Sequence, residues 1–381
     1  MTSSCIIWQN DRRTVVLLDL PRSIEEAQVP SRELSVADGE TPRKLRRLIS
    51  APQPASPFPT PEPKAGGRRQ PAWSPSAQVA ELMTQAAVES ALEEIKESYD
   101  GPWCLPRISA QPENSEVSSN APSSPPFPAA TAEEPSSTPP DPSLYHLPPS
   151  SHPFPGTISS RRTAFLSTTA PQQFNLIVLD PPWPNRSAKR KRAGAGAYRP
   201  AADLTSIRSL LSQIPVASRL APGGLVAVWV TNAARFSELL TTRHNGVFAE
   251  WDVELVGEWT WLKITASGEP VVPVESGWRK PWERLLIARK RGDAGAGDGE
   301  GECMRKGPIE GKVIVAVPDV HSRKPNLRCL FEEMLPEPYE ALEVFARNLT
   351  AEWWAWGDEV LLFQRRECWV DWGEQKSGDK L

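Results

Sequence analysis

The stretch that decides the fold is Asn175-Leu-Ile-Val-Leu-Asp180-Pro-Pro-Trp183-Pro-Asn185. Its short apolar run, from Leu176 to Leu179, predicts a buried strand. The two prolines after Asp180 prevent continuation as strand or helix, so we expect a rigid turn whose carbonyls are free to accept hydrogen bonds. An acid at the carboxyl end of a buried parallel strand lies where open α/β sheets bind ligands, and the Trp183 indole offers a stacking face. This pattern predicts a site for a flat heterocycle with an exocyclic amino group.

The overall composition indicates one packed part and one unpacked part. The chain has 381 residues, of which 39% are hydrophobic, and its 41 prolines are concentrated in the first half. Because the net charge is −4, binding to nucleic acid would require a local basic patch. The five cysteines are far apart without C-x-x-C spacing, which argues against a zinc site and for a reducing compartment. We expect no metal, no secretion signal and no membrane span.

Composition and patterning divide the chain into five parts. These are a hairpin region at 1–28, a disordered linker at 29–75, a helical segment at 76–107, a disordered Pro/Ser-rich linker at 108–153, and a globular domain at 154–373. The hairpin region predicts two strands around a polar turn followed by a capped helix. Such a hairpin is marginal alone, so it either docks on the later domain or frays. Residues 76–98 have the spacing of an amphipathic helix, for which core packing is the default.

The globular domain predicts alternating strands and helices. Residues 292–311 are rich in Gly and Glu and predict a surface insertion. Helices are expected at 204–220, 233–240 and 327–335, and strands at 225–231, 251–257, 259–264, 285–288, 313–317, 342–345 and 360–363. This alternation favours an α/β fold with a mainly parallel sheet flanked by helices.

The Asp-Pro-Pro-Trp stretch resembles the motif of the MT-A70 family, N6-adenine methyltransferases that use S-adenosylmethionine. The following loop is similar to that of the family's methyltransferase-like-four branch. From the residues alone, a rigid turn without chemistry remains an alternative. The resemblance implies a Rossmann-like methyltransferase fold with permuted motif order, and a docked N-terminal region. It also implies catalytic roles for Asp180, Pro181, Pro182 and Trp183.

The methyl donor would be bound near a second acidic strand end. Glu343 lies at the end of an expected strand, where carboxylates commonly accept hydrogen bonds from ribose hydroxyls, although a surface salt bridge from Glu343 to Arg347 is an equal alternative. The run from Glu343 and the run at 356–359 resemble the family's donor-binding stretches. The resemblance implies donor contacts from Asp180, Lys324, Glu343, Arg347, Asn348, Asp358 and Glu359. Asp358 stands where the family usually has Asn, so any hydrogen bond donated there would be lost.

The stretch from His321 to Asn326 is similar to the family's His-Ser-x-Lys-Pro stretch, which borders the donor pocket. We expect Pro325 in the first turn of a helix. Lys324 could meet the donor's carboxylate, and its alternative is a solvated cation. His321 is expected to be a packed histidine.

On the substrate side, the run from Gly277 to Glu283 resembles the family's Lys-Pro-Tyr-Glu loop, with Trp282 replacing the tyrosine and keeping its stacking face. Trp259 and Trp261 match a Trp-x-Trp-x-Lys run near the acceptor, and we expect Trp259 to be core. The resemblance implies substrate contacts from Asn185, Ser187, Lys189, Arg190, Lys263, Lys280 and Trp282.

Basic runs leave two interpretations open. The run at 189–192 predicts either phosphate contact or a nuclear-import signal with equal weight, and the runs at 43–47 and 68–69 favour a solvated linker over either role. We therefore expect the protein to be located in the nucleus, with the cytoplasm as a second location.

The expected activity is S-adenosylmethionine-dependent N6-adenine methylation of nucleic acid. The Asp180 carboxylate and the Pro181 carbonyl would accept the hydrogens of the amine. The resemblance favours RNA, as adenosine or 2′-O-methyladenosine in small nuclear RNA. The alternatives are DNA and a catalytically weak scaffold subunit. A monomer is expected, with a partner subunit left open.

Overall fold

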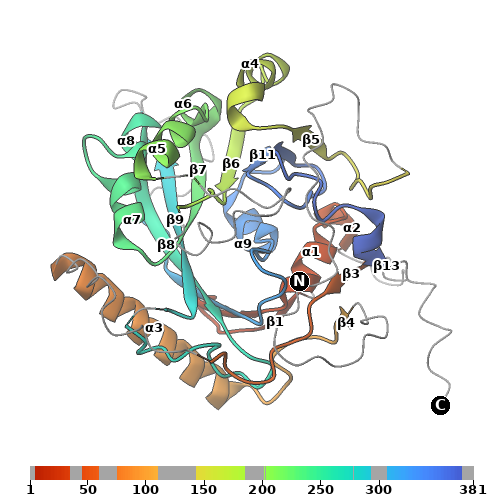
Figure 1. Ribbon diagram of the computed structural model, residues 1–381, viewed down its shortest axis with the longest axis vertical. Helices are drawn as coiled ribbons and strands as arrows, with labels where there is room; N and C mark the ends of the chain where they lie inside the picture. Colours follow the sequence, from red (N-terminus) through yellow and green to blue (C-terminus); the bar gives the residue numbers. More distant parts are fainter. Residues whose placement is uncertain are drawn as a thin grey trace.

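The computed structural model describes residues 5–34, 45–59, 75–109, 143–184, 201, 203–277, 279–292 and 307–370. Within these residues, ten strands form one large sheet (Figure 1). Their spatial order is β1 (Ile6–Gln9), β2 (Val15–Leu18), β10 (Lys312–Ala316), β8 (Val253–Lys263), β9 (Trp282–Lys290), β7 (Leu220–Val230), β6 (Phe174–Leu179), β11 (Ala341–Val344), β12 (Trp354–Gly357) and β5 (His152–Pro155). From β7 to β5 all neighbours are parallel, whereas β9 is antiparallel to β7 and β8. The sheet is mainly parallel and Rossmann-like, as predicted.

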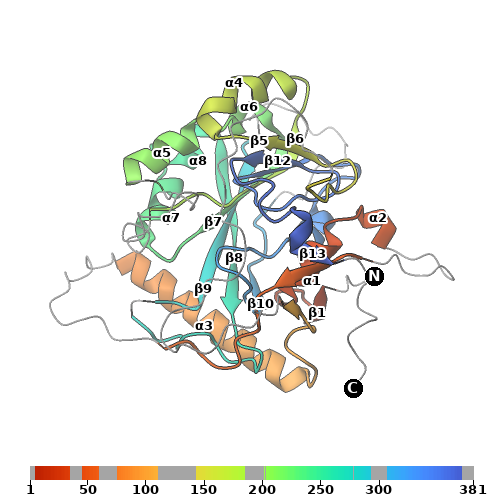
Figure 2. The same cartoon turned by 45° about the vertical axis from the view of Figure 1, so that its right-hand side comes forward.

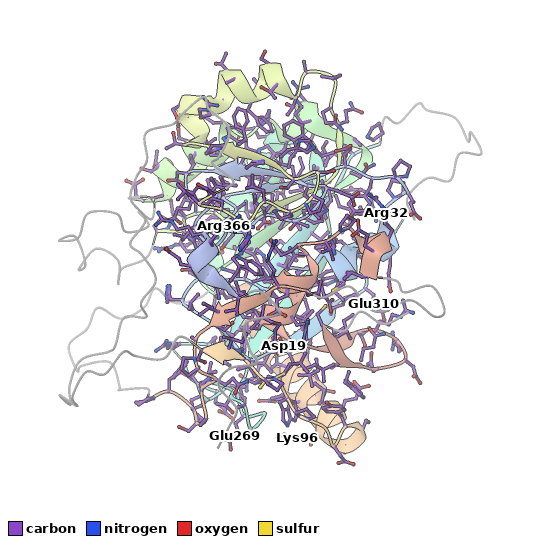
Figure 3. The ribbon with its side chains drawn as sticks, turned by 90° about the vertical axis from the view of Figure 1, so that its right-hand side faces the viewer. Asp19, Arg32, Lys96, Glu269, Glu310 and Arg366 are labelled. Atoms are coloured by element: carbon purple, nitrogen blue, oxygen red, sulfur yellow. The ribbon has the colours of Figure 1, made fainter. Side chains whose placement is uncertain are left out.

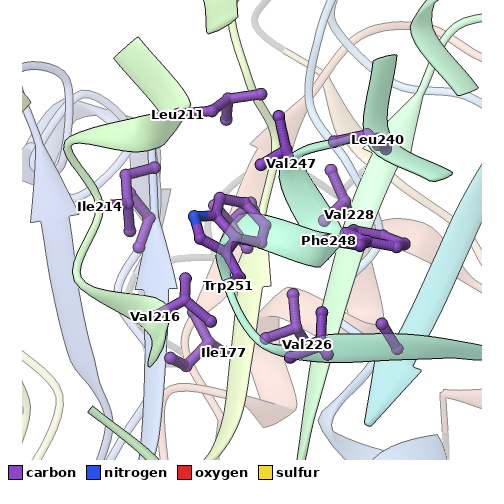
Figure 4. Packing of buried hydrophobic residues seen from close by; sticks show 14 of the residues in the cluster. Ile177, Leu211, Ile214, Val216, Val226, Val228, Leu240, Val247, Phe248 and Trp251 are labelled. Carbon is purple, nitrogen blue, oxygen red and sulfur yellow. The ribbon is translucent and has the colours of Figure 1, made fainter. Parts of the chain in front are cut away.

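Successive side chains on a strand point to opposite faces, so each strand supplies two cores. We call the side of Ile177 and Val226 the first face. It is buried by the helices α4 (Ile158–Thr168), α5 (Leu204–Ser212), α6 (Val216–Arg219), α7 (Ala234–Thr241) and α8 (Val247–Glu250). Figure 4 shows Trp251 packed among the apolar side chains of this core. The second face carries Leu176 and Leu225 and is covered by α1 (Leu20–Glu26) and α9 (Arg328–Phe331).

Two predicted boundaries in the globular domain are wrong for local reasons. The single helix expected at 204–220 is broken into α5 and α6, because Pro215 lacks the backbone N–H that a continuous helix requires. Conversely, the two strands expected at 251–257 and 259–264 are one strand, β8, which continues through an irregularity in its pairing with β9 between Leu255 and Gly257. The pairing with β9 thus continues through the glycine.

Two further predictions fail near the C-terminal end. Residues 360–363 form turns, closed by hydrogen bonds such as Leu362 N–H to the Glu359 carbonyl (2.9 Å), and the strand beside β11 is β12. The helix expected at 327–335 is only α9 followed by a 3-10 turn, Glu332–Met334. Pro325 therefore precedes the helix instead of lying in its first turn. Apolar residues alone did not distinguish a buried turn from a strand.

The N-terminal hairpin is part of the large sheet. β2 pairs in parallel with β10, and α1 is capped by Asp19, which accepts from the Arg22 N–H (2.9 Å) and also from the Leu105 N–H (2.8 Å). Figure 3 labels Asp19 among the side chains drawn as sticks. A short helix, α2 (Ser31–Leu34), follows. Two stretches predicted as linker contain strands: β3 (Arg47–Ser50) and β4 (Ile108–Ser109) form a small sheet with β13 (Trp369–Val370), after the 3-10 turn Arg366–Cys368.

The amphipathic helix predicted at 76–98 is α3 (Pro75–Ser98), which packs against β2, β8 and β10 (Figure 2). Its C-terminal half buries Val88, Leu92 and Ile95. In its N-terminal half Leu82 and Met83 are exposed, so core packing holds for half of the helix. No helix in the described ranges has the length and apolar character needed to cross a bilayer.

Candidate active site

The two acids singled out in the sequence lie on neighbouring strands and on the same face. Glu343 of β11 is paired with Val178 of β6, and Asp180 follows two residues later. Since Ile177 and Leu342 point into the first face, Val178, Asp180 and Glu343 belong to the second face. They line one cavity with Ile24, Trp229, Ser322, Arg323, Lys324, Pro325, Asn326, Leu327, Phe331, Phe345, Arg347, Asn348 and Trp353.

Alternating charges run through the wall of this cavity. The Lys324 ammonium lies 3.1 and 3.0 Å from the two oxygens of Asp180 and 3.2 Å from Glu283, which also pairs with Lys263. Burial tends to lower the pKa of Lys324, but the carboxylates of Asp180 and Glu283 outweigh it and hold the pKa above its usual value. Burial likewise tends to raise the pKa of Glu283, yet Lys263 and Lys324 lower it to about 2. Lys324 is therefore a partnered cation, contrary to the solvated alternative.

The pKa of Glu343 is shifted in the opposite direction to that of Glu283. Burial and the nearby charge of Asp180 raise its pKa to about 8, against a smaller lowering by Arg347. Arg347 forms an ion pair with Glu359 (Nε to Oε2, 2.8 Å) and donates to the Ser322 carbonyl (3.2 Å). Glu343 is thus a half-buried acid that lines the cavity and not half of a surface salt bridge, while Glu359 acts by holding Arg347.

The cavity presents groups that a nucleoside-containing amino acid requires. It offers an acid for hydroxyls in Glu343, a cation for a carboxylate in Lys324, and apolar walls from Ile24 and Phe331. The Asn348 side-chain nitrogen is buried and has no hydrogen-bond partner among the described residues. Because a buried donor without a partner is costly, this atom is suited to an acceptor on a bound molecule. The residues fit S-adenosylmethionine.

The Asp-Pro-Pro-Trp turn differs from its expectation in two details. The Pro181 carbonyl accepts from the Trp183 N–H (2.8 Å) and the Pro182 carbonyl from the Ala201 N–H (2.9 Å), so neither is free, although each oxygen keeps a second lone pair. Trp183 is only 6% exposed, packs on Phe236 (4.8 Å between ring centroids) and donates from its indole to the Trp229 carbonyl (2.7 Å). The expected open stacking face is covered in this structure, because the indole belongs to the core of the first face.

Trp282 is also buried, at 1% exposed, so its stacking face is not open either. The Lys280 ammonium lies 4.9 Å from its ring centroid, and this lysine pairs with Glu81 of α3 (3.2 Å). Trp259 is core, as predicted. Both tryptophans lie on strands that are covered on both faces, so their rings are buried.

Several predicted residues lie apart from the cavity. Asp358 is exposed, and His321 is exposed rather than packed, with its Nδ1 2.9 Å from the Ser322 hydroxyl. Asn185, Ser187, Lys189 and Arg190, together with the basic run at 189–192, lie outside the described residues.

Sequence reasoning gave no role to several residues of the site, among them Glu283, Trp229 and Ile24. Glu283 follows Trp282 directly in the sequence and bridges two lysines. Trp229 lies on β7 directly beside β6, with the Lys324 ammonium 5.8 Å from its ring centroid. Ile24 comes from the N-terminal region. Only strand adjacency could have indicated Trp229, and nothing local indicated Ile24.

Comparison with known proteins places this geometry in context. The MT-A70 family model matches residues 174–359. The N6-methyladenosine RNA methyltransferase MTA1 of Cryphonectria parasitica is 50% identical over 366 residues, which cover 96% of this chain and 94% of that protein. MTA1 of Pyricularia oryzae is 48% identical, with 97% of each chain covered. Human N(6)-adenine-specific methyltransferase METTL4 is 35% identical over 52% of this chain and 39% of its own length.

Proposed function

Because this chain belongs to the MT-A70 family and is an S-adenosylmethionine-dependent N6-adenine methyltransferase, we propose that it methylates adenine in RNA. The main evidence for this function is that Asp180 and Glu343 line the same cavity. The choice of RNA is supported by the names of the two relatives that align over nearly their whole length.

The donor is assigned to the part of the cavity around β11. Glu343 would accept from the ribose hydroxyls, Asn348 would donate from its unpartnered nitrogen, and Lys324 would contact the donor's carboxylate. Arg347 is held in place by Glu359, and Asp358 follows at the end of β12. S-adenosylmethionine supplies an electrophilic methyl group on a sulfonium. These residues hold and orient it without taking part in bond formation.

The acceptor amine is assigned to the rim formed by Asp180 and Pro181. A carboxylate has about four lone-pair sites, so two contacts from Lys324 leave room for a hydrogen of the amine. The Pro181 carbonyl can accept the second hydrogen on its remaining lone pair. Both contacts strengthen as positive charge grows on the nitrogen, which favours the transition state over the bound substrate. Pro182 and Trp183 would act by holding this turn.

RNA contacts are assigned to the loop after the turn and to the neighbouring strands. The stretch that follows the turn in the sequence would supply Asn185, Ser187, Lys189 and Arg190, and phosphates would be bound there. Lys263, which pairs with Glu283, and Lys280, which lies over the Trp282 ring, would supply the remaining contacts, and Trp282's own part would be to support Lys280. A monomer is part of the proposal, and a partner subunit is its alternative.

A nuclear location is part of the proposal and rests on the basic run at 189–192. The run at 43–47 supports it less, since Arg47 lies in β3 and pairs with Glu25 at 3.0 Å. Imaging a fluorescent fusion with the run at 189–192 neutralised tests this point, and an unchanged distribution would remove the run from the proposal.

The test of function is a methyl-transfer assay on RNA and DNA oligonucleotides of matched sequence, read by mass spectrometry of the nucleosides. RNA should yield N6-methyladenosine, or N6,2′-O-dimethyladenosine where the target adenosine carries a 2′-O-methyl group, and DNA should yield at least tenfold less product. Asp180→Ala should lower turnover by about 10³-fold or more while donor binding by calorimetry changes little. Preferred methylation of DNA would overturn the RNA assignment, and unaltered turnover of the variant would overturn the role of Asp180.

A further inference from the structure

Two cysteines from opposite ends of the sequence meet beneath the second face of the sheet. Cys5 precedes β1, and Cys329 lies in α9. Their Sγ atoms are 3.6 Å apart although 324 positions separate them in the sequence. Cys5 is 1% exposed, whereas Cys329 is half-buried. Both thiols pack in one apolar cluster with Leu20 and Phe331.

This arrangement is close to that of a disulfide. An S–S bond is about 2.05 Å long, so the sulfurs must approach by about 1.5 Å, a shift within reach of small side-chain rotations. Neither Cys104 nor Cys368 is paired with another cysteine in the described part of the chain. From this proximity and the unequal exposure, we propose that Cys5 and Cys329 are a redox-sensitive pair that forms a reversible disulfide.

The oxidant is a hydroperoxide, and the half-buried thiol meets it first. The Cys329 thiolate attacks one peroxide oxygen, an S–O bond forms, the O–O bond breaks, and hydroxide leaves to take up a proton as water. The sulfur of Cys5 then attacks the Cys329 sulfur, an S–S bond forms, the S–O bond breaks, and a second water leaves with the thiol proton. The sum is two thiols and hydrogen peroxide giving a disulfide and two waters. Thiol exchange with a small dithiol reverses it.

The bond would connect two walls of the described cavity. α1, which supplies Ile24, follows the hairpin that begins after Cys5, and α9 supplies Phe331. Elsewhere the packing of α9 against the N-terminal region depends on hydrogen bonds. For example, the Arg328 guanidinium donates to the Val29 and Glu26 carbonyls (2.8 Å each). A covalent link there restricts the unfolded chain strongly because the closed loop is long. This proposal stands independently of the choice of RNA.

The experiment uses the full-length protein, treated with hydrogen peroxide, alkylated and digested for mass spectrometry. A linked peptide pair containing Cys5 and Cys329 should appear and should vanish after dithiothreitol. The thermal midpoint should rise by about 5 °C on oxidation and return on reduction. Cys104→Ser serves as the matched control and should keep both effects.

Cys329→Ser should abolish the linked pair and the thermal shift, and it replaces a half-buried side chain, so it keeps the test valid should Cys5→Ala fold poorly. Separate alkylation of the two cysteines after oxidation would overturn the proposal. So would a sulfinic acid on Cys329 with Cys5 still a free thiol, or a linked pair involving another cysteine.

Discussion

The two faces of the large sheet bury different kinds of residues, although the same strands supply both. The first face is closed by α4 to α8 over an almost wholly apolar core. On the second face, apolar residues of α1 and α9 surround a cavity that contains Asp180, Lys324 and Glu343. The first face therefore supplies packing energy, whereas the second uses low polarity to strengthen the interactions between charges.

The different polarity of the two faces also explains why carboxyl groups on the second face have shifted pKa values. An isolated carboxyl is disfavoured as an anion when it is buried, so Glu343 retains its proton to about pH 8. Glu283, half-buried between two ammonium groups, is ionised down to about pH 2. Two half-buried acids of one site thus have pKa values far apart, which is the pattern expected where acids have separate roles.

The largest effect on stability should come from the apolar face. Phe165 of α4 is fully buried and stacks on Trp356 at 4.2 Å between ring centroids. Phe165→Ala should lower the free energy of unfolding by about 4 kcal/mol, because it removes buried area and leaves a cavity. Denaturant titration measures this. Leu82→Ala, at an exposed position of α3, is the control. A loss below about 1 kcal/mol for Phe165→Ala would contradict the assignment of packing energy to this face.

Glu343→Gln should stabilise the protein without donor at alkaline pH. The folded-state pKa of about 8 lies above the usual 4.5, so the folded state holds the extra proton between these values. That contribution is complete below about pH 4.5 and is lost as pH rises through 8. Since Gln cannot ionise, the variant should gain about 3 kcal/mol at pH 9 and little at pH 5.

Thermal unfolding from pH 5 to 9 measures this difference, with Glu254→Gln at an exposed position near the start of β8 as the control. Equal pH dependence of Glu343→Gln and the wild type would show that this carboxyl is not held neutral by the second face.

Glu283→Gln should lower the methylation rate by about tenfold, or about 1.4 kcal/mol. Without Glu283, Lys324 would bind Asp180 alone, and the carboxylate would be a weaker acceptor for the amine. Single-turnover rates at saturating donor measure this, and exposed Glu310→Gln is the control. A change confined to the donor Kd would assign Glu283 to the donor side instead.

The smallest effect should come from Trp183→Phe, which keeps the packing on Phe236 and removes the hydrogen bond to the Trp229 carbonyl. We expect a loss of about 1 kcal/mol in stability and less than a tenfold change in RNA affinity. Chemical unfolding and filter binding measure the two quantities. If RNA affinity falls more than tenfold while stability is unchanged, the indole contacts a base and the first face is not purely structural.

Local patterns in the sequence determined the order of most elements, the strand that ends at Asp180, the family motif and the acid at Glu343, because apolar runs, prolines and strand ends act over a few residues. The tertiary structure decided which groups those acids contact. Lys324 lies 144 positions from Asp180, Glu283 bridges two lysines, and Ile24 enters the cavity from the N-terminal hairpin region. The burial of Trp183 and Trp282 also depended on what packs over them. A side chain's neighbours, and hence its charge state and accessibility, are set by strand order and the covering helices, and no local pattern encodes these.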